Sequence, residues 1–335
     1  MITEVVFAPD WWHENGGIDF DADFFFEPER RVRDEMHMED VLYERFGYLG
    51  LGADSGKALP LVGPVHLAAG FLLQEMLGCR VEYFAAAPPA VHCSEDDSLH
   101  VDVEAAFASP TFKRFVKLCD RLEYKFGYLA GDVNYSGILN LALDIRGQNI
   151  FIDMTDRPDA VKCFFSEIAE VIERFADYVK KRTDSSGIAV NRTVRFFPGG
   201  IFLHSECSNT MIGNDQYNNF LNEFDRRWSQ KYPGFGIHYC GRDPERYAVE
   251  FAALPHLDFL DVGNGGDIAA LRKSLPNTFL NLRLDPVGII HQSPEEIHRN
   301  ILARTIAAGN PELCGICCIN MDKNVQDQQI AAIFR

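Results

Sequence analysis

The chain has 335 residues, of which 47% are hydrophobic and 24% charged, and its formal net charge is −17. This composition is typical of a globular protein with a large core. The negative charge argues against nucleic acid or an anionic membrane surface as a partner. No run of about 18 apolar residues is present, so we expect no transmembrane helix. The first residues lack the basic segment of a signal peptide, so we expect a cytoplasmic protein.

The first hundred residues are the least regular part of the chain. Aromatic and acidic residues alternate between positions 10 and 27. We interpret this stretch as an irregular aromatic and acidic N-terminal extension that packs on one end of the domain; a lid or an acidic docking surface is the alternative. Beyond it we expect a helix at 28–46, short strands at 47–52 and 61–65, and an apolar helix at 66–76.

From position 110 onward, apolar runs typical of strands alternate with segments of helical periodicity. The expected strands are 127–133, 200–205, 235–240, 257–262, 278–284 and 315–320. The expected helices are 110–126, 136–147, 158–182, 214–230, 244–253, 267–275, 294–308 and 325–334. This alternation favours a parallel sheet with helices outside it.

The number of these units, the chain length and the absence of a Gly-x-Gly-x-x-Gly turn favour a barrel over a doubly wound sheet. We therefore predict an α/β protein whose residues 1–335 form a single (β/α)8 TIM barrel. Residues 1–100 include the N-terminal layer packed on that barrel.

The strand at 235–240 carries the clearest chemical signal. Side chains two apart on a strand point to the same side, so His238 and Cys240 share one face. An imidazole and a thiol side by side at a strand end suit a borderline divalent metal, above all zinc. A third ligand must then come from elsewhere in the chain.

In a (β/α)8 barrel the active site lies at the carboxyl ends of the strands. Those positions carry many polar and metal-binding side chains: Asp132, His204, Glu206, His238, Cys240, Asp261, Asn264, Arg283, Asp285, Cys317 and Asn320. Cys317 is the best third ligand, because Cys318 points to the opposite side of its strand. Cys314 precedes the strand and is a weaker candidate.

At this point the sequence resembles a known family. His238-Tyr239-Cys240-Gly241 with the distant Cys317 resembles the His-x-Cys…Cys zinc pattern of cobalamin-dependent methyltransferases in the uroporphyrinogen decarboxylase superfamily. The methylcobalamin:coenzyme M methyltransferases are its best-known zinc members. The segments 284–287 and 293–297 resemble the Asp-Pro-Val turn and the Thr-Pro-Glu-Glu-Val helix start of that superfamily. The Arg-Gln-Ala-Gly-Arg stretch of the porphyrinogen decarboxylases is absent, so that activity is not expected.

The resemblance implies a zinc enzyme with His238, Cys240 and Cys317 as ligands and one open coordination position. A thiol bound there would become a thiolate and exchange a methyl group with methylcobalamin on a corrinoid protein. The resemblance thus implies zinc and a corrinoid as cofactors, and a corrinoid protein and a small thiol as partners. The expected catalytic residues are Asp132, Glu206, Arg283 and Asp285, and the expected cofactor contacts are His204, Asp261 and Asn264.

Other functional classes stay open at this stage. One is a metal-free lyase related to the decarboxylases, which would use Asp132 and Arg283 and survive chelation. Another is a non-catalytic accessory barrel that binds a corrinoid without transferring methyl. A third is a structural zinc protein, which needs a permanent fourth ligand such as Glu206 or Cys314 and would unfold when the metal is removed.

Overall fold

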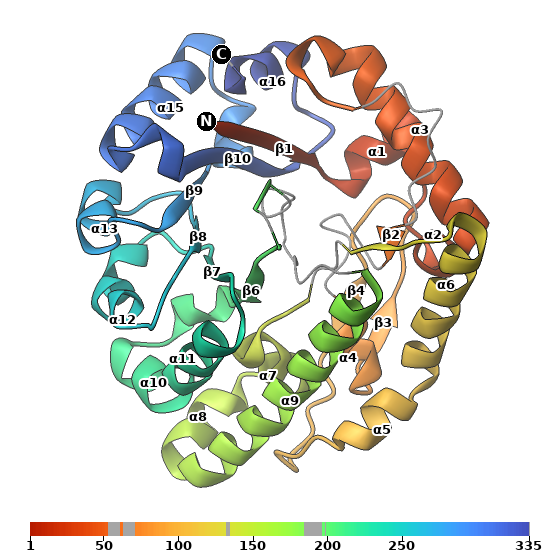
Figure 1. Ribbon diagram of the computed structural model, residues 1–335, viewed down its shortest axis with the longest axis vertical. Coiled ribbons are helices and arrows are strands. Elements are labelled where there is room, and N and C mark those ends of the chain that lie inside the picture. The colour runs from red at the N-terminus through yellow and green to blue at the C-terminus, as the bar shows by residue number, and fades with distance from the viewer. Residues whose placement is uncertain (53–60, 63–70, 132–134, 184–195, 198, 335) are drawn as a thin grey trace.

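The computed structural model describes residues 1–52, 61–62, 71–131, 135–183, 196–197 and 199–334 (Figure 1). The strands are β1 (Ile2–Phe7), β2 (Leu61–Val62), β3 (Arg80–Glu82), β4 (Ala90–His92), β5 (Ala130–Gly131), β6 (Phe202–Ser205), β7 (Phe235–Tyr239), β8 (Phe259–Val262), β9 (Phe279–Arg283) and β10 (Cys314–Met321). The 3₁₀ helices are η1 (Gly47–Leu49), η3 (Cys207–Met211), η4 (Pro244–Tyr247) and η5 (Pro311–Leu313).

The α-helices make up most of the remaining structure. They are α1 (Pro9–Gly16), α2 (Ala22–Phe26), α3 (Pro28–Phe46), α4 (Leu72–Met76), α5 (Val103–Ala108), α6 (Pro110–Phe126), α7 (Ile138–Arg146), α8 (Asn149–Asp156), α9 (Pro158–Thr183), α10 (Asn214–Phe220), α11 (Asn222–Lys231), α12 (Ala248–Ala252), α13 (Ile268–Ser274), α14 (Pro286–Ile289), α15 (Pro294–Ala308) and α16 (Asp327–Ile333). Within the described ranges, no helix is both long and apolar enough to cross a membrane.

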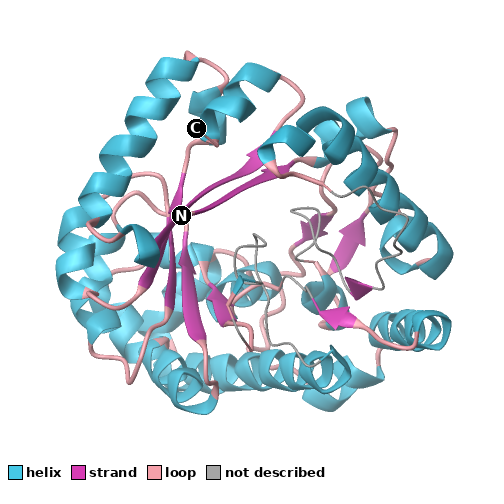
Figure 2. Ribbon diagram, turned by 45° about the horizontal axis from the view of Figure 1, so that its top comes forward, coloured by secondary structure: helices cyan, strands magenta, loops and turns pink. Residues whose placement is uncertain are grey.

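Six strands form a parallel sheet in the order β1-β10-β9-β8-β7-β6, and β2 pairs with β5 in a second, two-stranded parallel sheet. A small antiparallel hairpin, β3–β4, lies apart from both. The helices surround the strands from outside (Figures 1 and 2). In the part of the chain that the structure describes, no hydrogen-bonded pairing joins the two parallel sheets, so closure into a barrel is not detected.

The first strand is the main feature that the sequence prediction missed. Residues 2–7, assigned to an irregular layer, form β1, which runs parallel to β10 and pairs Glu4 with Cys317. The aromatic residues that follow are core: Trp11, Trp12 and Phe24 are almost completely buried. The N-terminal segment is therefore a packed arm and not an exposed docking surface.

Two helices begin and end where the sequence predicts, because both carry strong terminal signals. In α6, the Ser109 side chain accepts a hydrogen bond from the Phe112 amide, and Gly127 ends the helix in the left-handed conformation. In α15, Ser293 and Glu296 form a capping box around Pro294. Such caps satisfy amide groups that a helix start otherwise leaves unpaired.

Three expected elements differ from the structure. Residues 47–52 form η1 and a loop instead of a strand, because Gly50 and Gly52 adopt positive φ values of 83° and 71° that a strand does not accommodate. The helix expected at 214–230 is divided at Leu221 into α10 and α11. The helix expected at 244–253 begins as the 3₁₀ helix η4. Predicted positions 63–70 and 132–133 lie outside the described residues.

The strands of the large sheet bury both faces, as their nearly continuous apolar sequence requires. The outward side chains, such as Ile237 and Leu260, join the main core under the helices. The inward side chains are of two kinds. At the amino ends of the strands, Leu203, Phe259 and Phe279 form a small apolar cluster. Toward the carboxyl ends, polar groups replace these apolar side chains.

Candidate metal centre

Three side chains with metal-binding atoms lie together at the carboxyl ends of β6 and β7. They are Cys207, the first residue of η3, and His238 and Cys240 at the end of β7. Their ligand atoms all lie within 4.8 Å of one another. Ligands of a tetrahedral zinc, bound at about 2.0–2.3 Å, lie about 3.3–3.8 Å apart. Small side-chain adjustments therefore suffice for these three residues to hold one zinc ion.

His238 is oriented by a carboxylate on the neighbouring strand. The parallel register pairs His238 with Asp261, and His238 Nδ1 lies 2.5 Å from Asp261 Oδ2 with both side chains buried. Burial by itself would raise the pKa of Asp261, but His238 lowers it overall, so the carboxylate stays ionised. The proton then resides on Nδ1, and Nε2 is the ring atom available to a metal.

The two cysteines share one negative charge. The thiol of Cys207 donates to Cys240, and this hydrogen bond lowers the pKa of Cys240 while it raises that of Cys207. His238 and Arg283 lower the pKa of Cys240 further. These contacts favour the thiolate form of Cys240. A thiolate is the form of cysteine that binds a metal, so the pair suits a cation between them.

Arg283, at the end of β9, brings a positive charge into the same site. Its Nη1 lies 3.2 Å from His238 Nε2. Burial by itself would lower the pKa of Arg283, but Asp261, Cys317 and Cys240 raise it overall. The guanidinium is therefore a permanent cation in contact with Nε2 of His238.

A glycine after β8 lets its loop approach the backbone of Cys240 and Gly241. A Cβ atom at Gly263 would lie 2.1 Å from the Gly241 carbonyl oxygen and 2.5 Å from the carbonyl carbon of Cys240. Only glycine fits such an approach. Asn264, an expected cofactor contact, follows Gly263 in this loop and is partly exposed. The structure thus places Asn264 in the loop that adjoins the centre.

Cys317, the predicted third ligand, is not part of the three-residue group. Its Sγ is buried on β10 and accepts a hydrogen bond from Asn281 Nδ2 at 3.2 Å. It also lies 3.9 Å from Asp261 Oδ1, on the side of the carboxylate away from His238. The third residue of the group that the structure brings together is Cys207, which the sequence analysis did not propose. The sequence feature that could have indicated Cys207 is its position directly after Glu206, at the end of a strand.

Other predicted residues have separate partners. Cys314 is the first residue of β10, pairs with Leu280 and is buried in the apolar core, away from the carboxyl end of the strand. Asp285 accepts a hydrogen bond from the Val287 amide and caps α14. Asp132 lies outside the described residues.

His204 and Glu206 belong to a second, fully buried cluster. His204 shares the outward face of β6 with Phe202, and its ring meets the edge of Trp228 in α11. His204 Nδ1 lies 2.7 Å from Asp225 Oδ1, and Nε2 lies 3.3 Å from Glu206 Oε2. This places His204 among the helices and not beside the thiols.

Glu206 ties this second cluster to the start of α7. Its carboxylate accepts hydrogen bonds from the amides of Leu139 and Asn140 at 2.8 and 3.2 Å. A negative charge at a helix start is favourable. A Cβ atom at Gly137 would lie only 2.6 Å from Glu206 Oε2, so glycine is needed there. Glu206 therefore already has partners that a metal or substrate would have to displace.

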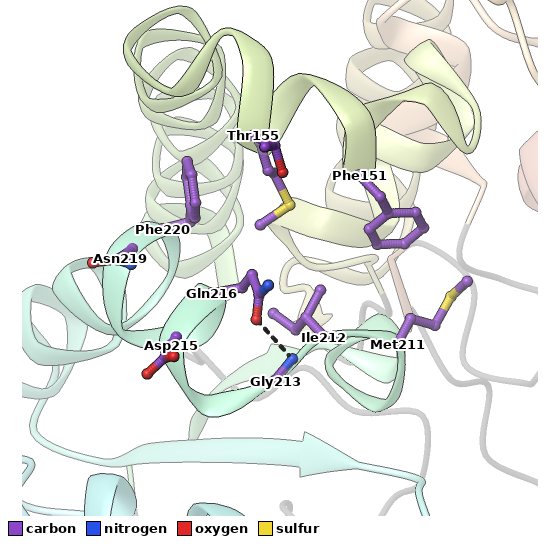
Figure 3. Close-up of a pocket in the computed structure, with 10 residues that line it drawn as sticks. Phe151, Thr155, Met211, Ile212, Gly213, Asp215, Gln216, Asn219 and Phe220 are labelled. Atoms are coloured by element: carbon purple, nitrogen blue, oxygen red, sulfur yellow. Dashed lines mark hydrogen bonds between the residues drawn. The ribbon is translucent and has the colours of Figure 1, made fainter.

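A surface pocket of about 280 Å³ lies between α8, η3 and α10 (Figure 3). Met211 and Ile212 line it, and Gln216 points to the Gly213 amide, from which it accepts a hydrogen bond at 3.1 Å. Cys207 stands at the opposite end of η3 from Met211. None of the three residues of the metal centre lines this pocket.

No protein-family model matches the sequence, and no curated protein matches it. Among solved structures, the chain is similar to a methyltransferase from Methanosarcina mazei, with a TM-score of 0.65 and 13% sequence identity. The match covers 98% of this chain and 93% of that one. At this identity the likeness establishes a shared fold, and the two chains have the same architecture over nearly their whole length.

Proposed function

We propose that the protein is a zinc-dependent corrinoid methyltransferase. It would move a methyl group between methylcobalamin, carried by a corrinoid protein, and a thiol or similar acceptor. The observation that carries this proposal is the group of two cysteines and one histidine at the strand ends. The sequence resemblance around His238 and Cys240 supports it, as does the fold shared with a protein named as a methyltransferase.

The proposal extends to the fold and to the cellular compartment. The six-stranded sheet and the β2–β5 pair supply eight parallel strands, the number that a (β/α)8 barrel needs. We propose that these strands form one barrel, with the metal centre at its carboxyl face, in a cytoplasmic protein. The reducing cytoplasm keeps cysteines as thiols, which a cysteine-bound metal centre requires.

Each residue of the centre has a definite part in this chemistry. Cys207, His238 and Cys240 would hold the zinc, which when bound stabilises an acceptor thiol as its thiolate. Asp261 keeps the proton of His238 on Nδ1 and aims Nε2 at the centre. Arg283 supplies a positive charge that can pair with an anionic end of the acceptor.

Metal content tests the proposal directly. Zinc per chain is measured by elemental analysis in the wild type and in the C207S, C240S and C317S variants, with circular dichroism to confirm folding. We expect about one zinc in the wild type, loss in C207S and C240S, and retention in C317S. Loss in C317S with retention in C207S would restore the ligand set predicted from the sequence. A folded wild type that binds no supplied zinc would refute the metal centre.

A metal-free lyase is the second candidate function, because of one specific contact. Arg283 Nη1 donates to His238 Nε2, and the resulting group of cation, imidazole and thiolate can act on an anionic substrate without a metal. Chelation separates the candidates. Methyl transfer from methylcobalamin to a thiol stops without zinc, whereas lyase activity persists. An accessory protein binds cobalamin and transfers no methyl group.

A further inference from the structure

Arg283 and a metal need the same atom. The Nη1 of Arg283 donates to His238 Nε2 at 3.2 Å, while His238 Nδ1 is held by Asp261 at 2.5 Å. Nε2 of a neutral imidazole has one lone pair. A lone pair that accepts a hydrogen bond from arginine is not available to a metal ion. The guanidinium and the metal are therefore alternative partners of His238.

The positive charge of Arg283 lies beside a buried negative charge. The carboxylate of Asp261 is buried beside His238, and a nearby positive charge stabilises a buried carboxylate. Arg283 contacts the histidine that this carboxylate holds. It therefore offsets the negative charge that a bound cation would otherwise balance.

The backbone of Arg283 is fixed, so only its side chain can change place. The amide of the next residue, Leu284, donates a hydrogen bond to the Cys317 carbonyl oxygen at 2.8 Å. The strand pairs Arg283 with Cys317 on β10. Rotation about side-chain bonds is enough to release His238, and no rearrangement of the sheet is needed.

We propose that Arg283 is a built-in cation that occupies the metal-binding atom of His238 in the metal-free protein and is exchanged for the metal when the metal binds. This inference rests on the proposed metal centre. A metal ion beside the guanidinium would place two positive charges in a space with little water, so binding of the metal expels the side chain. Arg283 thereby keeps the ligands arranged before loading and weakens the affinity for the metal.

Zinc affinity of an arginine variant tests the exchange. Metal-free wild type, R283Q and R304Q are titrated with zinc in competition with a chromophoric chelator. Loss of the competing charge in R283Q is expected to tighten zinc binding by about tenfold or more. R304Q is the matched control, because Arg304 contacts the carbonyl of Arg283 and not His238. Its affinity should stay within about threefold of the wild type.

A second measurement follows the side chain itself. The arginine side-chain NMR signals of the wild type are recorded with and without zinc, and the signal of Arg283 is assigned by its absence in R283Q. Exchange predicts that this signal shifts when one equivalent of zinc is added, while that of Arg304 does not. An Arg283 signal unchanged by bound zinc would overturn the exchange.

The outcomes distinguish the two proposals. Equal zinc affinities in the wild type and R283Q, or weaker binding by a folded R283Q, would overturn the exchange and leave the metal centre intact. Zinc binding that is detectable only in R283Q would show that Arg283 bars the metal instead of exchanging with it, and would overturn the exchange. Failure of the folded wild type and of both variants to bind zinc would overturn the metal centre, and the exchange with it.

Discussion

Two buried histidines on adjacent strands show how similar local arrangements serve different purposes. His204 on β6 and His238 on β7 are 0% and 1% exposed. In each, Nδ1 contacts an aspartate, Asp225 at 2.7 Å and Asp261 at 2.5 Å. Such a pair fixes the ring orientation and makes Nε2 the nitrogen that faces the rest of its site.

The two histidines differ in the side chain that contacts Nε2. In His204 it faces Glu206, a carboxylate already engaged with the start of α7. In His238 it faces Arg283, close to the thiolate of Cys240. The first histidine lies between two carboxyl groups, Asp225 and Glu206, which raise its pKa. The second histidine lies beside Arg283 and Cys240, and a metal ion or a substrate can replace Arg283 as its partner. Under the proposed function, the partner of the second nitrogen therefore separates a structural histidine from a reactive one.

The largest effect is expected from removal of the reactive histidine. H238A loses the nitrogen ligand, and two cysteines alone do not hold a catalytic zinc. We expect no zinc at micromolar concentrations and no methyl transfer from methylcobalamin, with the circular dichroism spectrum retained. Elemental analysis after dialysis measures the metal. H204Q is the comparison, and a folded H204Q that also lost its zinc would erase the distinction between the two histidines.

Removal of the structural histidine is expected to act on stability. H204A leaves Asp225 and Glu206 buried without their shared partner, and loss of one member of a buried charged group costs about 3–5 kcal/mol in the free energy of unfolding. Urea denaturation measures it. H256A provides the control, because the His256–Asp258 pair is partly exposed and should cost about 1 kcal/mol or less. Equal losses in the two variants would contradict a buried ionic role for His204.

The protonation of His204 predicts a pH dependence. Burial by itself would lower its pKa, but Asp225 and then Glu206 raise it from 6.5 to about 9. The folded state thus binds the proton more tightly than the unfolded state. The stabilisation is fully present below about pH 6.5 and is lost as the pH rises through 9, by about 3 kcal/mol at most. Unfolding free energies from pH 6 to 9.5 should fall more steeply for the wild type than for H204Q; parallel curves would count against a charged His204.

A smaller effect is expected at the aspartates. D261N removes the charge that holds the proton on His238 Nδ1, and loss of such a partner weakens metal binding by about 10–100-fold. D225N alters the equivalent partner of His204 and should leave the zinc affinity unchanged. Chelator competition measures both variants. Equal affinities of D261N and the wild type would show that Asp261 does not orient a metal ligand.

The smallest effect is expected at Cys317. Its thiol contacts Asn281, and burial raises its pKa, so C317S should keep its zinc with an affinity within about fivefold of the wild type. The same chelator titration applies. A complete loss of zinc would return Cys317 to the ligand set and show that the site rearranges when the metal binds.

The sequence alone determined the local elements and one side of the site. Helices α6 and α15 follow from their caps and apolar periodicity, and most strands follow from short apolar runs between turns. The period of two in a strand placed His238 and Cys240 on one face. The first strand, Ile2–Phe7, was not predicted, because its apolar run is short and only pairing with β10 defines it.

Only the tertiary structure decided which side chains meet. Strand periodicity indicates a face, but contacts across strands depend on register and on the path of the following loop. The turn into η3 brings Cys207 to Cys240, whereas Cys317 stays beside Asn281. For His204 the decisive partner is Asp225, which a helix distant in sequence supplies. Such contacts are set by packing over long sequence separations, and so no local pattern contains them.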